Sequence, residues 1–141
     1  MTTIAYRNGV LAADGLGTRG SWLLPGKAQK LFRMKDGGMA AITGDYANGC
    51  QYIHWLNDPK SDAPNMGDAS IIRIHPDHTC TVYENGGSYR EDVAEFCAWG
   101  SGMPAALAAL HMGAEAAMAV LIASKVDGGT NAEVTVMKCE P

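Results

Sequence analysis

Several features that would place this chain in a familiar class are missing. No apolar run approaches the ~20 residues that a membrane-spanning helix needs, so we expect no membrane association. No cluster of lysine and arginine stands out against a formal net charge of −4, which argues against nucleic acid and anionic membranes as partners. The first residues contain no basic region followed by an apolar stretch, so we expect no secretory signal.

Metal-binding patterns are missing as well. The cysteines form no CxxC pair and no zinc-type spacing; they are Cys50, Cys80, Cys97 and Cys139. Without a secretory signal, we expect reduced thiols and a cytoplasmic location. His75, Asp77 and His78 lie close together in the sequence, but no fourth ligand accompanies them. We therefore expect neither a metal nor another cofactor.

What the chain does contain is typical of one folded domain. Apolar residues make up 47% of the 141 residues and charged residues 18%, which suits a chain that forms a core. No internal repeat, low-complexity tract or linker divides it. We therefore expect a single domain over residues 1–141.

Turn signals and apolar patterns predict strands and helices in blocks. Asn8-Gly9 is a hairpin signal, and Asp45 is a suitable N-cap for a helix that Asp58-Pro59 would end. We expect strands at 3–6, 10–13, 28–34, 39–43, 70–74, 79–83, 93–99 and 132–137, and helices at 45–56, 103–112 and 114–125. Because regular βαβ units are missing, this order favours two antiparallel sheets with helices packed outside, a layered α+β arrangement.

The residue after the initiator methionine could act as a nucleophile. Thr2 is small enough for the cell to remove Met1, which would leave a hydroxyl and an α-amine on one residue. An unperturbed α-amine has a pKa of about 8, which suits a general base at neutral pH. Such a residue can be its own nucleophile and base. Many chains begin with Met-Thr without this role, so the dipeptide needs support from the rest of the sequence.

That support comes from motifs along the chain. Thr2-Thr-Ile-Ala5 is followed by Leu11-Ala-Ala-Asp-Gly15, and then by Lys27-Ala-Gln-Lys30, Ala41-Ile-Thr-Gly44 and Trp99-Gly-Ser-Gly102. In order and spacing the chain resembles the proteasome β-subunit and HslV family of N-terminal-nucleophile hydrolases over nearly its whole length. The resemblance implies a four-layer αββα sandwich of two antiparallel sheets flanked by helices.

The resemblance also implies roles for individual residues. Thr2 matches the nucleophile and Lys30 the lysine beside it, which would lower the pKa of the threonine amine and hydroxyl. Asp14 matches the carboxylate that holds this lysine, since a buried charge of either kind is costly without the other. Gly44 matches the glycine whose backbone N–H binds the developing oxyanion.

Three further residues match the supporting groups of the nucleophile. Ser101 matches a serine that hydrogen-bonds near the α-amine, and it could also serve as the N-cap of a helix at Met103. Asp127 and Thr130 fall where the family carries an aspartate and a serine, so Thr130 departs from the pattern. For Asp14 and Lys30, a strand-ending turn and a solvated side chain are the ordinary alternatives.

Substrate contacts follow from the same resemblance. The residues matching peptide-pairing positions and the pocket before the scissile bond are Gly17, Thr18, Ala28, Phe32, Ile42 and Tyr46. Most of them are apolar, so we expect cleavage after apolar residues. An extended peptide would pair with the backbones of Thr18 and Tyr46 in the manner of an added strand.

The chain also departs from the family. Between Leu56 and Ser70 it has a loop where relatives have a second long helix, and it ends soon after its last strand. We therefore expect a shortened helical layer and a homo-oligomer, with ring formation and an ATPase unfoldase as open questions.

Three functions fit this sequence. The first is a threonine peptidase acting on peptides or unfolded proteins, and the second is an amidase of the same fold acting on a small amide. The third is a catalytically silent assembly subunit. Retention of Met1 would favour the third, because an acylated Thr2 amine cannot act as a base.

Overall fold

The computed structural model describes residues 2–93 and 95–139. Its elements, in chain order, are β1 (Thr3–Arg7), β2 (Val10–Ala13), β3 (Thr18–Arg19), β4 (Trp22–Leu23), β5 (Leu31–Arg33), β6 (Met39–Thr43), α1 (Tyr46–Asn57), β7 (Ser70–Ile74), β8 (Cys80–Glu84), β9 (Gly87–Glu91), β10 (Phe96–Gly100), α2 (Met103–His111), α3 (Ala116–Ser124) and β11 (Thr135–Lys138). Within this described part, no helix is long and apolar enough to cross a membrane.

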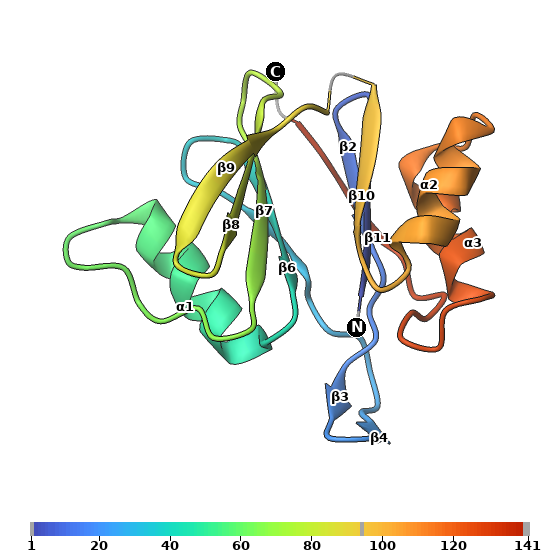
Figure 1. The fold of residues 1–141 in the computed structure, drawn as a ribbon, viewed down its shortest axis with the longest axis horizontal. Coiled ribbons are helices and arrows are strands. Elements are labelled where there is room, and N and C mark those ends of the chain that lie inside the picture. Colours follow the sequence, from blue (N-terminus) through green and yellow to red (C-terminus); the bar gives the residue numbers. More distant parts are fainter. Residues whose placement is uncertain (1, 94, 140–141) are drawn as a thin grey trace.

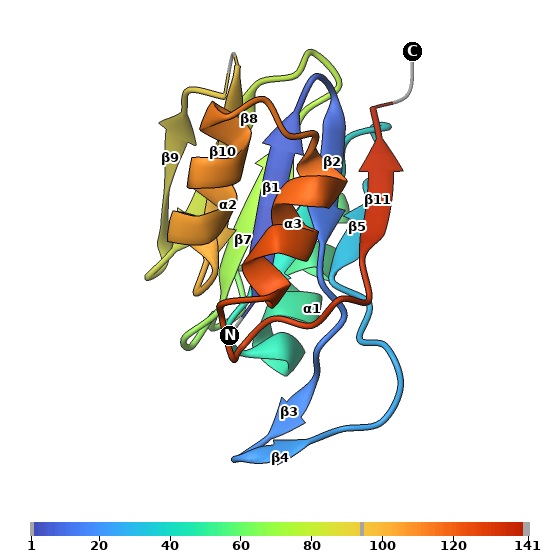
Figure 2. The ribbon, with the colours of Figure 1, turned by 90° about the vertical axis from the view of Figure 1, so that its right-hand side faces the viewer.

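Two antiparallel sheets lie face to face between two helical layers (Figure 1). One sheet has the strand order β10-β1-β2-β11, and the other has the order β5-β6-β7-β8-β9. Helix α1 packs on β6 and β7, whereas α2 and α3 cover β1, β2 and β10 (Figure 2). The α+β, four-layer αββα sandwich is therefore confirmed, and α1 alone forms one of its outer layers among the described residues.

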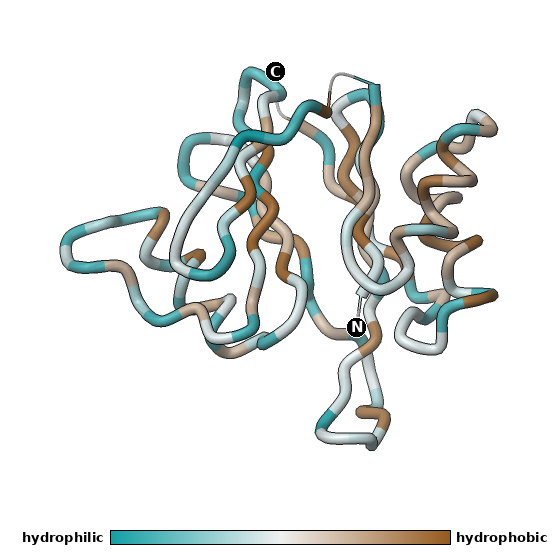
Figure 3. The backbone as a smooth tube through the Cα atoms, viewed as in Figure 1, coloured by the Kyte–Doolittle hydropathy of each residue, from teal (hydrophilic) through white to brown (hydrophobic). Residues whose placement is uncertain are grey.

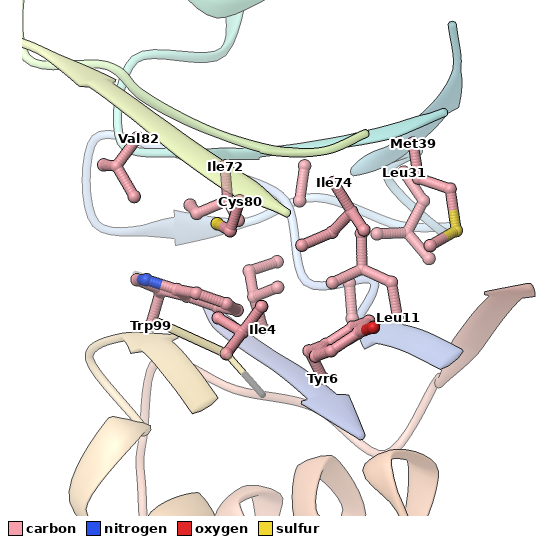
Figure 4. Packing of buried hydrophobic residues seen from close by; sticks show 13 residues of the cluster. Ile4, Tyr6, Leu11, Leu31, Met39, Ile72, Ile74, Cys80, Val82 and Trp99 are labelled. Atoms are coloured by element: carbon pink, nitrogen blue, oxygen red, sulfur yellow. The ribbon is translucent and has the colours of Figure 1, made fainter. Parts of the chain in front are cut away.

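The sandwich follows from strands that are apolar on both faces. In β1, Ile4 and Tyr6 point between the sheets, whereas Ala5 points toward the helices. In β7, Ile72 points between the sheets and Ile71 toward α1. Successive side chains of a strand alternate between its faces, so each strand can contribute to two cores. Figure 4 shows the large side chains of the central core meeting from the two sheets.

Small residues let the helices approach the first sheet closely. The layer between this sheet and the helices is built mostly from alanine, at Ala5, Ala12, Ala98, Ala106, Ala109, Ala116, Ala119 and Ala123. Leu110 and Val120 fill the remaining space, and both are fully buried. The alanine-rich composition of residues 103–125 therefore has a packing role as well as favouring helix.

Local signals place the elements much as expected. Asn8 and Gly9 have φ of 52° and 78°, typical of the tight turn between paired strands. Asp45 is the N-cap of α1, where its side chain accepts a hydrogen bond from the N–H of Asn48. The expected strand at 28–34 is shorter, at Leu31–Arg33, and the N–H of Ala28 donates instead to the carbonyl oxygen of Gly15 at 2.8 Å.

Two strand pairings were not expected from the sequence. Strands β3 and β4 form a short hairpin that projects from the body of the molecule (Figure 1). Strand β9 pairs with β8 at the edge of the larger sheet. Both β3 and β9 are mostly exposed, so their sequences lack the apolar alternation that marks a buried strand.

Candidate active site

The β1–β2 hairpin sets Asp14 beside the start of the chain. Ile4 pairs with Ala13, so Asp14 follows directly opposite Thr3. The N–H of Thr3 donates to Asp14 Oδ1 at 3.1 Å, and Asp14 is only 1% exposed. The strand register therefore places a buried carboxylate next to Thr2.

Lys30 reaches the same point from the segment that precedes β5. Its Nζ donates to Asp14 Oδ1 and to Thr2 Oγ1, both at 3.0 Å, and the residue is 6% exposed. Burial lowers the pKa of Lys30, an effect that the charge and hydrogen bond of Asp14 partly offset. A buried ammonium of lowered pKa beside a hydroxyl can stabilise the alkoxide form of that hydroxyl.

The nitrogen of Thr2 lies on the other side of this residue, facing Ser101. In the described chain this atom is a peptide N–H joined to Met1, and it stands in for the α-amine of a processed chain. It donates to Ser101 Oγ at 3.2 Å. The Ser101 hydroxyl in turn donates to Asp127 Oδ2 at 2.7 Å. A defined series of hydrogen bonds thus links the Thr2 nitrogen to a carboxylate.

Thr130 completes this series. Its hydroxyl donates to Asp127 Oδ2 at 2.6 Å and lies 2.6 Å from the hydroxyl of Thr3. The hydrogen bond from Thr130 is the largest cause of a lowered pKa at Asp127, and the bond from Ser101 adds to it. Asp127 is therefore held as an anion, which orients the Ser101 hydroxyl to accept from the Thr2 nitrogen.

Ser101 does not cap the helix that follows it. Gly102 is the N-cap of α2, and no side chain makes a capping hydrogen bond there. The alternative interpretation of Ser101 as an N-cap for the helix at Met103 is therefore wrong. The reason is that the Ser101 hydroxyl donates a hydrogen bond to Asp127 and accepts one from the Thr2 nitrogen, so it is not available to α2.

The backbone at position 44 requires glycine. Gly44 has a φ of +80°, and an added Cβ would lie 2.1 Å from the carbonyl oxygen of Asp68. No other residue fits this position without moving the backbone. Gly44 borders the same cleft as Thr2 and Lys30.

A cleft of about 730 Å³ opens beside these groups. It is lined by Thr2, Leu16, Gly17, Thr18, Arg19, Leu24, Lys27, Ala28, Gln29, Lys30, Ile42, Gly44, Asp45, Tyr46 and Ala47. The hydroxyl of Tyr46 donates to the carbonyl oxygen of Gln29 at 2.6 Å, which fixes the aromatic ring at the edge of the cleft. The β3–β4 hairpin supplies one wall of the cleft and α1 begins at the other.

Most of the expected substrate-contacting residues line this cleft, and one does not. Gly17, Thr18, Ala28, Ile42 and Tyr46 are among its lining residues. The side chain of Phe32 packs instead against the core cluster beneath α1. Successive side chains of β5 point to opposite faces of the sheet, and Phe32 lies on the face that α1 covers rather than on the side of the cleft.

The sequence did not single out Asn131 or Leu24. The backbone N–H of Asn131 donates to Asp14 Oδ2 at 3.2 Å, and its side-chain oxygen accepts from the N–H of Gly15 at 3.0 Å. Asn131 thereby fastens the end of β2 to the last loop. An asparagine in a turn is common, so no sequence signal marked this role. Leu24 belongs to the unexpected β3–β4 hairpin.

The side chains of His75 and Asp77, in the turn between β7 and β8, make hydrogen bonds within their own hairpin. A ring nitrogen of His75 lies 2.9 Å from Thr81 Oγ1, and Asp77 accepts hydrogen bonds from both the N–H and the hydroxyl of Thr79. Among residues 2–93 and 95–139, no group of three or more His, Cys, Asp or Glu side chains is arranged to hold a metal ion.

The αββα sandwich is the fold of the N-terminal-nucleophile hydrolases, and in this chain it sets Thr2 among Lys30, Asp14 and Ser101. Solved structures similar to the chain include HslV from Trypanosoma brucei, with a TM-score of 0.75 and 19% identity over 96% of this chain and 97% of that one. Thiobacillus denitrificans BPH matches with a TM-score of 0.66 and 19% identity over 99% and 98%. BPH in complex with epoxomicin matches with a TM-score of 0.65 and 20% identity over 99% of both chains.

The likeness lies in the fold rather than in the sequence. No protein-family model matches the chain, and no curated protein matches it. Identities near one fifth, spread over nearly the full length of both chains, establish the shared fold. The roles of individual residues must be argued from the geometry of the site.

Proposed function

We propose that this chain is a threonine-type peptidase that uses Thr2 as its nucleophile once Met1 has been removed. The observation that carries the proposal is the position of Thr2 Oγ1, 3.0 Å from the buried ammonium of Lys30 at a cleft also bordered by Gly44. The fold that the chain shares with HslV from Trypanosoma brucei supports a peptidase function.

The reaction follows from these groups. Thr2 Oγ1 attacks the substrate carbonyl carbon and its proton passes to the α-amine, while the N–H of Gly44 stabilises the oxygen anion. The carbon–nitrogen bond then breaks, and the departing amine takes the proton from the α-ammonium. This leaves an ester on Thr2. Water, deprotonated by the same α-amine, hydrolyses the ester and restores the threonine.

Lys30 and Ser101 support this reaction from either side. The Lys30 ammonium favours the ionised form of the hydroxyl through its charge. Ser101 accepts a hydrogen bond from the Thr2 nitrogen, so it fixes the direction of the amine lone pair relative to Oγ1. Asp127 holds Ser101 in this orientation. Asp14 in turn holds Lys30.

The cleft supports cleavage after apolar residues. Ala28, Ile42 and Leu24 offer apolar surface, whereas Arg19 and Asp45 bring charges of both signs to the lining. Peptide substrates ending in Leu, Arg or Glu before a fluorogenic amide separate these effects. We expect the Leu substrate to be cleaved with the highest kcat/KM, and a clear preference for Arg or Glu would overturn this specificity.

Intact-mass measurement of the purified protein tests the nucleophile directly. A peptide epoxyketone presents two adjacent electrophilic carbons, so a free N-terminal amino alcohol can bond to both of them. We expect a mass lower by one methionine and one covalent adduct per chain. Thr2→Ala is the matched control: its small second residue also permits methionine removal, but it lacks the hydroxyl and should form no such adduct.

Two other outcomes would point to the competing functions. A retained methionine without an adduct, in protein from its native source, would favour a silent assembly subunit. An adduct at Thr2 together with hydrolysis of small amides but not of peptides would favour an amidase.

A further inference from the structure

The β3–β4 hairpin has two faces that differ in the residues they carry. Its cross-strand neighbours are Thr18 with Leu23, Arg19 with Trp22, and Gly17 with Leu24. Residues opposite each other share a face, and successive pairs alternate between the two faces. Arg19, Trp22 and Leu24 therefore lie on one face of the hairpin, together with position 17.

This face continues a wall of the cleft. A Cβ added at Gly17 would lie 3.6 Å from the Cβ of Ala28 and 3.7 Å from Leu24 Cδ1, so the face looks toward the part of the cleft that Ala28 lines. Arg19 and Leu24 are themselves among the lining residues. Figure 3 shows both teal, hydrophilic and brown, hydrophobic stretches on this projecting hairpin. A peptide held in the cleft can therefore extend along the hairpin.

Arg19 differs from the other charged residues that line the cleft. Lys30, Lys27 and Asp45 each make a hydrogen bond within the chain. The Arg19 side chain is exposed, and among residues 2–93 and 95–139 it has no hydrogen bond or ion pair. A guanidinium presents its N–H donors in a planar fork that matches both oxygens of a carboxylate. Arg19 is thus available to bind a carboxylate of a substrate.

Trp22 lies beside Arg19 on the same face. The two residues are paired across the hairpin, where side chains are close enough to interact. Trp22 is 78% exposed, although its indole is largely apolar. An indole next to a guanidinium covers part of an ion pair formed there, and keeping water from such a pair strengthens it. We call the surface formed by Arg19 and Trp22 the hairpin site.

Strand alternation decides which substrate residue reaches the hairpin site. The pocket expected before the scissile bond includes Gly17 and Ala28, at the base of this face. In a strand added beside β3, the side chains next to positions 17 and 19 share a face, and the side chain between them points away. We propose that Arg19 selects peptides with an acidic side chain at the third residue before the scissile bond. This inference rests on the peptidase function proposed above and adds the class of peptide that the site accepts.

Peptides that differ at one position test this selection. The series carries Leu directly before a fluorogenic amide and Glu, Gln or Lys at the third position before that amide. We expect kcat/KM to be about fivefold higher for the Glu peptide than for the Gln peptide, the upper range for an exposed ion pair, and lowest for the Lys peptide. Glu at the second position, where the side chain points away, should give no advantage. Equal values for Glu and Gln at the third position would refute the selection.

Variants of Arg19 assign the preference to this side chain. Arg19→Gln should remove the difference between the Glu and Gln peptides, and Arg19→Glu should make the Lys peptide the best of the three. Lys35→Gln is the matched control, because it removes an exposed positive charge at the end of β6 opposite Gly44, and it should keep the order of the peptides. A full Glu preference in Arg19→Gln, or its loss in Lys35→Gln, would show that Arg19 does not select the peptide.

Binding to an inactive chain separates this proposal from the peptidase function. Thr2→Ala lacks the nucleophile, so fluorescence anisotropy of labelled Glu and Lys peptides measures recognition without cleavage. We expect the Glu peptide to bind more tightly, and Arg19→Gln in the same background to bind both peptides equally. Such binding by a chain whose wild-type form cleaves no peptide would overturn the peptidase function and leave the hairpin site in place. Cleavage by the wild type with binding that does not depend on Arg19 would overturn the hairpin site alone.

Discussion

Replacement of Asp14 should destabilise the fold more than replacement of Lys30, although the two residues form one ion pair. The Asp14 carboxylate accepts hydrogen bonds from Lys30 Nζ at 3.0 Å, from the N–H groups of Thr3 and Leu16 at 3.1 Å each, and from the N–H of Asn131 at 3.2 Å. It thus ties together three separate backbone segments. The side chain of Lys30 donates to the carboxylate and to the Thr2 hydroxyl, so its hydrogen bonds join side chains rather than backbone segments.

The loss in the free energy of unfolding for Asp14→Asn follows from the number of donors that lose their acceptor. An amide has one oxygen, so in either orientation two of the four donors would face an NH₂ group. A buried donor without an acceptor costs about 1–3 kcal/mol, and a buried charge that loses its partner costs about 3–5 kcal/mol. We expect Asp14→Asn to lower the free energy of unfolding by on the order of 5 kcal/mol, a large part of a domain's total stability.

Lys30→Met should cost less than Asp14→Asn. The carboxylate keeps its three backbone donors, and the methionine side chain fills nearly the same space. The ammonium is itself costly to bury, since burial lowers its pKa. Because these donors remain, we expect Lys30→Met to lower the free energy of unfolding by about 3 kcal/mol, the low end of the cost of a buried charge that loses its partner, while abolishing peptidase activity.

Urea unfolding followed by tryptophan fluorescence, at one fixed protein concentration, measures both changes. Lys30→Met should be folded and inactive, and Asp14→Asn should be strongly destabilised as well as inactive. If Lys30→Met loses as much stability as Asp14→Asn, the ion pair rather than the backbone anchoring holds the segments together, and the reasoning is wrong.

Two further predictions concern a tightly packed glycine and two buried thiols. Gly102→Ala would place a Cβ 1.9 Å from the hydroxyl of Thr3, so we expect it to lower the free energy of unfolding by on the order of 3 kcal/mol, measured in urea, and to lower the activity. Gly128→Ala, with no atom within 4 Å of its Cβ, should leave the free energy of unfolding unchanged. Equal losses in the two variants would show that the effect is not steric. Burial raises the pKa of the Cys80 and Cys97 thiols to about 12 and about 11. The folded chain therefore keeps these protons where the unfolded chain loses them, so stability should fall above about pH 9 by at most about 1.4 kcal/mol per pH unit for each thiol. Urea midpoints across this range should fall less steeply for Cys80→Ala, and an unchanged slope would remove this thiol as a cause.

The sequence was most informative where local chemistry decides the structure. Asn8-Gly9 predicted a turn because few other residue pairs accept positive φ, and Asp45 predicted a helix start because its side chain can accept the first free N–H. It was least informative for β3–β4 and for β9. These strands are short and exposed, so hydrogen bonding to a neighbour, rather than burial of an apolar face, defines them.

Some residues of the site were predicted from sequence motifs, and others were not. Motifs predicted that Thr2, Asp14 and Lys30 would belong to one site, and the structure brings these three residues together. Asn131 was not predicted, since its backbone N–H does the binding and almost any residue supplies one. Phe32 was misplaced in a list of cleft residues for a related reason: which face of β5 it occupies depends on the strand's register, which no motif encodes.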